Sequence, residues 1–190
     1  ISEDSQNPGV AKLKVIKLIE KDKVDVLIGE ISSASGLAIS EEAQRHKIVY
    51  VNTGFNTDEA RGAKCRRYMF HVEGCNTMYT KTVGRWLLRE RKISKWYFLT
   101  ADYAYGHEMV RGFQAAGKAF GVETLADIRH PLGTTDFSAL LPRIQALKPD
   151  ILIINNFGRD QQIALKQATD FGMKKSMKLV APIANGPYTT

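Results

Sequence analysis

The chain of 190 residues lacks the short motifs that mark the common enzyme classes. It contains no Gly-x-Ser-x-Gly nucleophile turn, no phosphate-binding Walker loop, no Gly-x-Gly-x-x-Gly turn and no His-Glu-x-x-His zinc motif. Its two cysteines do not supply the four-ligand pattern of a structural zinc site. We therefore expect a protein that is not an enzyme, with no catalytic residue, no metal site and no cofactor.

Cysteine is scarce, and its spacing bears on the question of a disulfide. An even number of cysteines, here Cys65 and Cys75, is compatible with one disulfide in an exported protein. Residues 67–72 between them, however, have the pattern of a strand, and ten extended residue steps from Cys65 to Cys75 would hold the two Cα atoms about 30 Å apart. A disulfide requires about 7 Å or less. The spacing favours two unpaired thiols.

Long apolar runs are also missing. No run approaches the roughly 20 residues that span a bilayer, so we expect no direct membrane insertion. Residues 1–9 are polar and turn-forming, which is not the pattern of a signal peptide. A signal peptide is therefore expected to be absent from this chain, whether or not the protein is exported.

The basic balance of the sequence does not point to nucleic acid. The net charge is +7, but lysine and arginine are spread over the whole chain. Their densest group covers an expected helix end, where the helix dipole favours cations: Arg85, Arg89, Arg91, Lys92 and Lys95. Neither an RNA-binding signature of aromatics and glycines nor zinc-finger spacing is present, so no nucleic-acid partner is expected.

What the sequence does contain is a regular alternation of short apolar runs with amphipathic stretches. Strands are expected at residues 24–28, 48–51, 68–72, 96–99, 122–128, 151–154 and 179–181. Helices are expected at residues 10–21, 33–46, 78–91, 105–120, 137–147 and 160–171, and a turn at residues 185–187. This order predicts an α/β fold with mostly parallel sheets and right-handed crossovers.

Two of these helices carry more specific expectations. The helix at residues 78–91 is expected to bury an apolar stripe made of Met78, Val83, Trp86 and Leu87. The helix at residues 137–147 is expected to be capped by Thr135 or Asp136.

The loops that follow the predicted strands have a shared character. Residues 29–36, 52–55, 101–106 and 155–158 are rich in hydroxyl, amide and aromatic side chains and poor in groups for covalent chemistry. In open α/β sheets, ligands bind beyond the carboxyl ends of the strands. The loops therefore indicate a binding protein. Ser32 and Ser33 open a helix, where they either form an anion site or act only as an N-cap.

The order of several short motifs resembles that of the type I periplasmic binding proteins, and more narrowly the receptors of branched-chain amino-acid-type ABC transporters. The motifs are Asn7-Pro8-Gly9-Val10-Ala11, Leu18-Ile19, residues 23–29, the Ser32-Ser33 loop, Tyr103-Ala104-Tyr105-Gly106, residues 130–138 and residues 168–172. The resemblance covers essentially the whole chain. It implies two Rossmann-like parallel-sheet lobes present here as a partial chain, with residues 1–74 in the first lobe, residues 75–190 in the second, and a hinge near residues 74–76.

The resemblance also implies ligand-binding residues. Ser33, beside Ser32, matches a loop serine that holds a ligand carboxylate, and Thr53 and Phe55 match two pocket positions of the first lobe. In the second lobe, Tyr105 matches a ligand-facing tyrosine and Phe157 another aromatic position, and Tyr103 belongs to the same motif as Tyr105. Packing in the core is the alternative for Phe55, Tyr105 and Phe157.

One departure from the family's pattern bears on the ligand. Amino-acid receptors of this family carry an acidic residue after the proline of the last strand present here, where it binds the ligand ammonium, but Ile183 follows Pro182. An ammonium buried without a counter-charge is strongly disfavoured. Two alternatives stay open for Asp102 and Asp160. Either one of them supplies the counter-charge, or Asp102 is a solvated loop residue and Asp160 a helix cap. An aromatic or aliphatic carboxylate, or an amide, fits these loops better than an α-amino acid.

The resemblance therefore implies an extracytoplasmic, periplasmic receptor of an ABC transporter. It would bind a small organic solute between two lobes and then dock on a membrane permease. The alternative within the same fold is a regulator that senses an amide or amino acid, or a receptor ectodomain.

Overall fold

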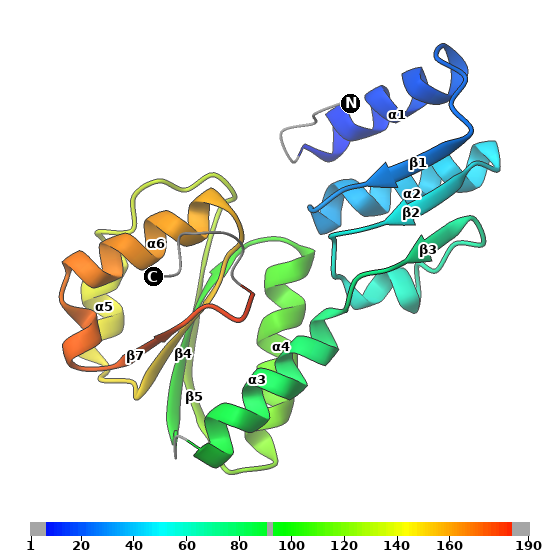
Figure 1. Ribbon diagram of the computed structural model, residues 1–190. Helices are drawn as coiled ribbons and strands as arrows, with labels where there is room; N and C mark the ends of the chain where they lie inside the picture. The colour runs from blue at the N-terminus through cyan, green and yellow to red at the C-terminus, as the bar shows by residue number, and fades with distance from the viewer. Residues whose placement is uncertain (1–6, 91–92, 184–190) are drawn as a thin grey trace. The chain divides into compact units, whose positions relative to one another are not determined.

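The computed structural model describes residues 7–90 and 93–183. The chain divides into two compact units, Ile1–Asn76 and Thr77–Thr190, called here unit 1 and unit 2 (Figure 1). The turn predicted at residues 185–187, and the end of the helix predicted to reach residue 91, lie outside the described residues.

Unit 1 is a three-stranded parallel sheet with two helices. Along the chain it contains α1 (Pro8–Glu20), β1 (Val26–Gly29), α2 (Ser33–His46), β2 (Val49–Asn52), the short 3₁₀ helix η1 (Asp58–Arg61) and β3 (Met69–His71). The strand order is β1-β2-β3, and both pairs are parallel. The strand predicted at residues 68–72 is therefore an edge strand, whereas the stretch predicted as a loop at residues 56–64 contains η1.

Local signals place the helices of unit 1. The Oδ1 atom of Asn7 accepts hydrogen bonds from the backbone N–H groups of Gly9 and Val10, at 2.9 and 3.1 Å, and so caps α1. Pro8 follows at the first helical position, where its missing N–H leaves no unpaired donor. Lys47, in the left-handed conformation with φ 56°, ends α2.

The sheet of unit 1 differs sharply between its two faces. On the helix-covered face, Tyr50 and Phe55 pack with Val15 and Ile19 of α1 and with Leu37 of α2. On the opposite face the apolar side chains are exposed in the described structure: Val26, Ile28, Val49, Phe70 and Val72. Parallel sheets are ordinarily covered on both faces, so only one face of this sheet has its usual cover among the described residues.

Unit 2 is a four-stranded parallel sheet between helices. Its elements are α3 (Asn76–Glu90), β4 (Lys95–Ala101), α4 (Ala104–Lys118), β5 (Glu123–His130), α5 (Leu141–Ala146), β6 (Ile151–Asn155), α6 (Arg159–Asp170), η2 (Met173–Lys175) and β7 (Lys178–Val180). The strand order is β5-β4-β6-β7, with every neighbouring pair parallel. The predicted strands are thus all present, with bounds shifted by a few residues.

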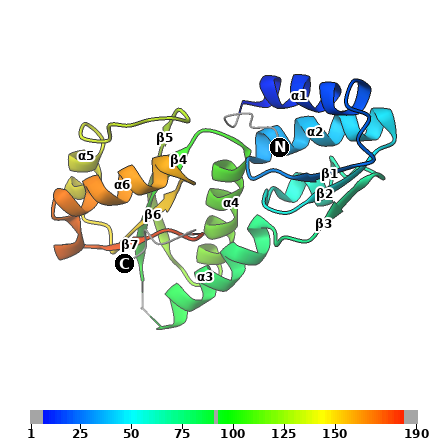
Figure 2. The same ribbon diagram turned by 45° about the horizontal axis from the view of Figure 1, so that its top comes forward.

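Both faces of the sheet in unit 2 are covered, as Figure 2 shows, by α3 and α4 on one side and by α5 and α6 on the other. Alternate residues of β6 divide between the two faces. Ile151 and Ile153 pack in the cluster that contains Phe113 of α4, whereas Leu152 and Ile154 pack in the cluster that contains Leu141 of α5. This alternation decides which face each later residue of β6 meets.

Two sequence-based expectations were wrong in unit 2. The helix predicted at residues 137–147 is only α5, because Pro142 has no N–H and fits within the first turn of a helix but not in its interior. Asp136 caps a turn, accepting the N–H of Ser138 at 2.9 Å, and does not cap α5.

The apolar stripe predicted for α3 was right only in part: Leu87 is buried and Val83 packs against the same cluster. Met78 and Trp86 are exposed. The helix instead packs on α4 through Gly84, where an added Cβ would lie 3.2 Å from the side chain of Ala116. Close approach at this small residue turns Leu87 and Leu88 into the core.

Candidate functional site

In unit 1 the loops that follow β1 and β2 lie against each other. A Cβ atom added to Gly54 would lie 2.8 Å from the carbonyl oxygen of Glu30, so the two backbones are nearly in contact. In the same way, a Cβ added to Gly36 in the first turn of α2 would overlap the ring of Phe55. The loop of Ser32 and Ser33 therefore adjoins the loop that carries Thr53 and Phe55.

The amino end of α2 already holds a carboxylate of its own loop. Ser32 is the N-cap, and its Oγ accepts the N–H of Ser35 at 3.4 Å, while Ser33 is the first helical residue and is buried. The Oε1 atom of Glu30 accepts the N–H groups of Ile31 at 2.8 Å and Ser32 at 2.6 Å. Ser32 thus acts as the N-cap foreseen as its alternative, and Glu30 bonds the two residues that precede the helix.

Glu30 was not chosen as a candidate from the sequence, and its unusual backbone conformation appears only in the structure. It follows directly on Gly29, which ends β1 with φ 126°, and Glu30 itself has φ 77°. A positive φ outside glycine marks a constrained position and is common near functional loops. The sequence shows only a glutamate after a strand-ending glycine.

Asn52, the last residue of β2, organises the turn that contains Thr53. Its Oδ1 accepts the N–H groups of Gly54 and Phe55, both at 3.0 Å. Its Nδ2 donates to the carbonyl of Phe55 at 2.7 Å and to Nδ1 of His71 at 3.0 Å. The last bond requires an unprotonated Nδ1, and burial, together with the charge of Arg61, lowers the pKa of His71.

The two predicted site residues of this turn, Thr53 and Phe55, differ in their exposure to solvent. Thr53 is exposed at the tip, where a ligand can reach its hydroxyl. Phe55 is fully buried and packs in the core of unit 1 against Tyr50 and His71, with ring centroids 6.3 and 5.8 Å apart. The placement of Phe55 corresponds to the core-packing alternative.

In unit 2 the predicted aromatic residues form one cluster at the carboxyl ends of β4 and β6. The ring of Tyr105 lies 5.7 Å from that of Tyr103 and 6.2 Å from that of Phe157, centroid to centroid. Tyr105 is buried, whereas Tyr103 and Phe157 are half-buried. The three side chains are therefore together, with Tyr105 innermost.

The hydroxyl of Tyr105 is buried and has no hydrogen-bond partner among the described residues. Burial raises its pKa well above the ordinary value, and Tyr103 and Tyr79 add to that effect. Burial likewise raises the pKa of Tyr103, with a further contribution from the carboxylate of Asp160. Both phenols are neutral near pH 7.

The loop after β6 is held by a network of hydrogen bonds. Oδ1 of Asn156 lies 3.0 Å from Nε2 of His130, and Nε2 of Gln161 donates to the carbonyl of Asn156 at 3.0 Å and to that of Ile183 at 2.8 Å. Its neighbour Asn155 is fully buried, yet neither its Oδ1 nor its Nδ2 has a partner among the described residues. Asn155 was not selected from the sequence, although the strand-terminal pair Asn155-Asn156 was the available signal.

Neither alternative counter-charge for an ammonium is free of other interactions. Asp102 lies 2.6 Å from Nε2 of His107 and 4.0 Å from the guanidinium of Arg129. Asp160, in the first turn of α6, accepts the N–H of Gly133 at 2.8 Å. Asp102 is exposed, which corresponds to the solvated-loop alternative, whereas Asp160 does not cap α6, whose N-cap is Gly158.

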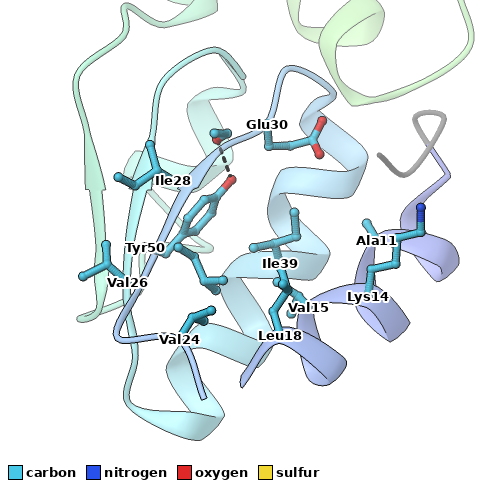
Figure 3. A pocket seen from close by; sticks show the side chains of 12 residues that line it. Ala11, Lys14, Val15, Leu18, Val24, Val26, Ile28, Glu30, Ile39 and Tyr50 are labelled. Carbon is cyan, nitrogen blue, oxygen red and sulfur yellow. Dashed lines mark hydrogen bonds between the residues drawn. The ribbon is translucent and has the colours of Figure 1, made fainter. Parts of the chain in front are cut away.

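A cavity of about 250 Å³ lies in unit 1 between α1 and β1 (Figure 3). Its lining is mostly apolar, with Lys14 and Glu30 as the charged side chains, and the hydroxyl of Tyr50 donates across its wall to the carbonyl of Gly29 at 3.1 Å. None of the residues predicted to bind ligand lines it. It lies along β1 and does not define the site of the serines and Thr53.

The described part of the chain offers no cluster of three or more histidine, cysteine or acidic side chains that could hold a metal ion. Within residues 7–90 and 93–183, no helix combines the length and the apolar character needed to cross a lipid bilayer. Neither cysteine forms a disulfide in the described structure; Cys65 is exposed and Cys75 is buried.

Two parallel α/β units, each with hydroxyl, amide or aromatic side chains gathered at the carboxyl ends of its strands, define the type I binding-protein class of α/β fold. The family comparison agrees with this class. The family model described as "Periplasmic binding protein" matches residues 1–189, and the chain belongs to this family.

Similar proteins of known name or structure include periplasmic binding proteins and a solute-binding protein of an ABC transporter. A curated relative, Leu/Ile/Val-binding protein homolog 4 of Brucella abortus, is 25% identical over 184 residues, which are 90% of this chain and 43% of that protein. A solved periplasmic binding protein from Burkholderia mallei is 32% identical, with a TM-score of 0.90 over 96% of this chain and 48% of that one. A solute-binding protein of an ABC transporter from R. palustris, solved in complex with benzoate, is 26% identical, with a TM-score of 0.88 over 94% of this chain and 49% of that one. The chain therefore spans about half the length of these proteins.

Proposed function

We propose that this chain is part of the extracytoplasmic solute-binding receptor of an ABC transporter. In this proposal the receptor works in the periplasm, binds a small organic solute without altering it, and delivers it to a membrane permease. Membership of the periplasmic binding protein family and the similarity to transporter receptors support the proposal. We also propose that the chain forms parts of two lobes joined by a hinge near residues 74–76.

The observation that carries the proposal is the grouping of the predicted binding residues within each unit. Ser33 and Thr53 come from adjoining loops at the carboxyl ends of β1 and β2, and Tyr103, Tyr105 and Phe157 form one cluster at the ends of β4 and β6. Hydroxyl groups and rings without an activated nucleophile serve binding rather than chemistry.

We infer that the ligand is an aromatic or aliphatic carboxylate rather than an α-amino acid. Ile183 follows Pro182 at the position where the resemblance implies an acidic partner for a ligand ammonium, and Asp102 is paired with His107. The aromatic cluster of unit 2 suits a flat apolar solute, and the similar protein from R. palustris was solved with benzoate.

The mechanism proposed for the receptor is ligand-driven closure. The solute contacts Ser33 and Thr53 in unit 1 and Tyr105 and Phe157 in unit 2, and its binding energy favours the conformation in which both sets of contacts form. A ligand shifts such an equilibrium only by its difference in affinity between the two conformations. The permease then distinguishes loaded from empty receptor by the conformation it meets.

Isothermal titration of the full-length protein with benzoate and with leucine tests this proposal. We expect benzoate to bind with a dissociation constant in the micromolar range, about −8 kcal/mol, and leucine to bind at least about tenfold more weakly. Mass spectrometry of the denatured complex should recover benzoate unchanged. Micromolar leucine binding without benzoate binding would contradict the proposed ligand class.

The exposed hydroxyl of Thr53 provides a clean variant for the same titration. Thr53→Val keeps the shape of the side chain and removes its hydroxyl from an exposed position, so stability should stay within about 0.5 kcal/mol. Benzoate affinity should fall about fivefold, the loss expected for one hydrogen bond. Unchanged affinity would remove Thr53 from the site.

A further inference from the structure

Two asparagines occupy equivalent positions in the two sheets and differ completely in their hydrogen bonding. Asn52 ends β2 and Asn155 ends β6, and both are fully buried. Asn52 uses both donors and both acceptor positions of its amide, on Gly54, Phe55 and His71. Asn155 uses none on the described residues.

The strand register places the side chain of Asn155 on the sheet face that meets the first turn of α4. Asn155 pairs with Thr100 of β4, as Ile153 pairs with Phe98, so these side chains share the face of the sheet that α4 covers. The first turn of α4 lies directly on this point, because a Cβ added to Gly106 would lie 2.8 Å from the side chain of Thr100. Tyr105, whose hydroxyl is also unpartnered among the described residues, precedes Gly106.

The loop that follows Asn155 is well bonded, so a loose local backbone does not explain the unpaired amide. Asn156 and Gln161 tie it to His130 and to the carbonyl of Ile183. Burial of an unpaired polar group costs free energy, and such groups are rare in folded proteins. A rigid loop that retains one at the carboxyl end of a buried strand is typical of a preorganised binding site.

We propose that Asn155 is a specificity-determining residue whose amide binds an uncharged hydroxyl group of the ligand. This inference rests on the proposed function and deepens it. It narrows the ligand class to a carboxylate that carries a hydroxyl at the end bound by unit 2, for which a hydroxybenzoate is the simplest probe.

The chemistry of the amide selects a hydroxyl over a charged group. The Nδ2 group only donates and the Oδ1 atom only accepts, whereas a hydroxyl both donates and accepts and so satisfies the two atoms together. A carboxylate at this position would leave Oδ1 unpaired and repelled, and an ammonium would do the same to Nδ2. The neutral hydroxyl of Tyr105 adapts to either role and completes the same polar group.

The test compares benzoate with 3-hydroxybenzoate and 4-hydroxybenzoate on the full-length protein and on its Asn155→Leu variant. We expect the wild-type protein to prefer one hydroxylated acid over benzoate by at least about tenfold. The variant should lose this preference and keep its benzoate affinity within about threefold, because only the partner of the hydroxyl is removed.

The matched variant Asn52→Leu controls for folding. Asn155→Leu should leave the melting temperature unchanged or raise it, since it removes an unpaired buried amide, whereas Asn52→Leu should lower it by several degrees. A drop for Asn155→Leu as large as that for Asn52→Leu would overturn the proposal. So would a hydroxyl preference that survives Asn155→Leu, or a wild-type protein without any such preference.

The outcomes also separate this inference from the proposed function. Tight benzoate binding without a hydroxyl preference leaves the receptor function standing and rejects the role of Asn155. Failure of all three aromatic acids, with leucine bound instead, rejects the proposed ligand class and the hydroxyl assignment together.

Discussion

In unit 1 the polar side chain at the end of the central strand is Asn52, and its amide is fully hydrogen-bonded within the fold. It bonds the backbone of Phe55 in the turn that follows and the ring of His71 on the next strand. In unit 2 the corresponding side chain, Asn155, is equally buried and unpaired among the described residues. The same residue type at the same topological position is thus fully hydrogen-bonded in one unit and without a partner among the described residues in the other. Hydrogen-bond satisfaction, rather than burial or residue type, distinguishes the two roles.

The two units also differ in how their sheets are covered. Unit 2 buries both faces of its sheet in two apolar clusters. Unit 1 covers one face and leaves Ile28 and Phe70 of the other face exposed in the described structure, at 73% and 56%. Both units nevertheless contain a buried apolar core, so substitutions in the two cores should cost similar amounts of stability. Substitutions of the polar residues at the strand ends should cost different amounts in the two units.

The largest effect is expected from the turn of unit 1. Asn52→Leu leaves the N–H groups of Gly54 and Phe55 and the carbonyl of Phe55 without these hydrogen bonds. The free energy of unfolding should fall by about 3 kcal/mol, at roughly 1 kcal/mol for each lost bond. Urea denaturation followed by unit-specific hydrogen exchange measures it. A loss below about 1 kcal/mol would mean that the turn does not depend on this amide.

A paired substitution tests whether the two cores are equally close-packed. Gly36→Ala and Gly117→Ala each place a methyl group into a buried ring, that of Phe55 in unit 1 and that of Trp96 in unit 2. Each should cost about 2 kcal/mol through overpacking. Gly62→Ala is the control, since its Cβ would meet only a backbone oxygen at an ordinary 3.5 Å. A large cost in one unit alone would show that the cores differ.

A smaller effect is expected at the start of the sheet in unit 2. Asp150 accepts the N–H and hydroxyl of Ser94 and the N–H of Lys95, at 2.7 to 2.9 Å. Partial burial alone would raise its pKa, but these bonds outweigh that effect and lower it. Because the group is largely exposed, Asp150→Asn should cost only about 1 kcal/mol near pH 7.

The pH dependence of Asp150 has a definite sign. Its folded pKa lies below the unfolded value of about 3.9, so its contribution is present above that value and is lost as the pH falls through the folded pKa. The Asn variant should therefore differ least from the wild type in strong acid. An equal difference at pH 7 and pH 2 would contradict this assignment.

The smallest stability effects come from two histidines of unit 1 that titrate in opposite directions. Burial and Arg61 lower the pKa of His71 below 6.5, so stability falls as the pH drops below about 6.5 and the unfolded chain takes up the proton. The carbonyl of Glu42 and the carboxylate of Glu20 raise the pKa of His46, so its contribution is full below about 6.5 and is lost as the pH rises through the folded pKa.

Together these two histidines predict a shallow maximum in the stability of unit 1 near pH 6.5. On the acid and alkaline limbs of this maximum, stability should fall by less than about 1 kcal/mol. Melting temperatures measured from pH 5 to 8 should show it. His71→Gln should flatten the acid limb and His46→Gln the alkaline limb. A maximum that survives both substitutions would have another origin.

Much of the architecture was predictable because it is encoded locally. The apolar runs and the helix signals, such as Asn7 with Pro8 and the glycine after α6, require only neighbouring residues, so the α/β order and parallel sheets were confirmed. The stripe of α3 was wrong at Met78 and Trp86, which are exposed, because the helix packs on α4 through Gly84 and Ala116, a contact that the sequence of α3 does not reveal. The roles of the predicted site residues in ligand binding stay predictions.

The sequence by itself determined the order of elements and the polar, aromatic character of the loops, since both depend on residue type and short-range spacing. It could not distinguish Asn52 from Asn155, because each simply follows an apolar strand. Only the tertiary structure brought His71 from β3 to Asn52, while it placed Asn155 beside Thr100 and the first turn of α4. Whether a buried amide is satisfied depends on atoms supplied by distant parts of the chain, and those are positioned only when the sheet and helices pack.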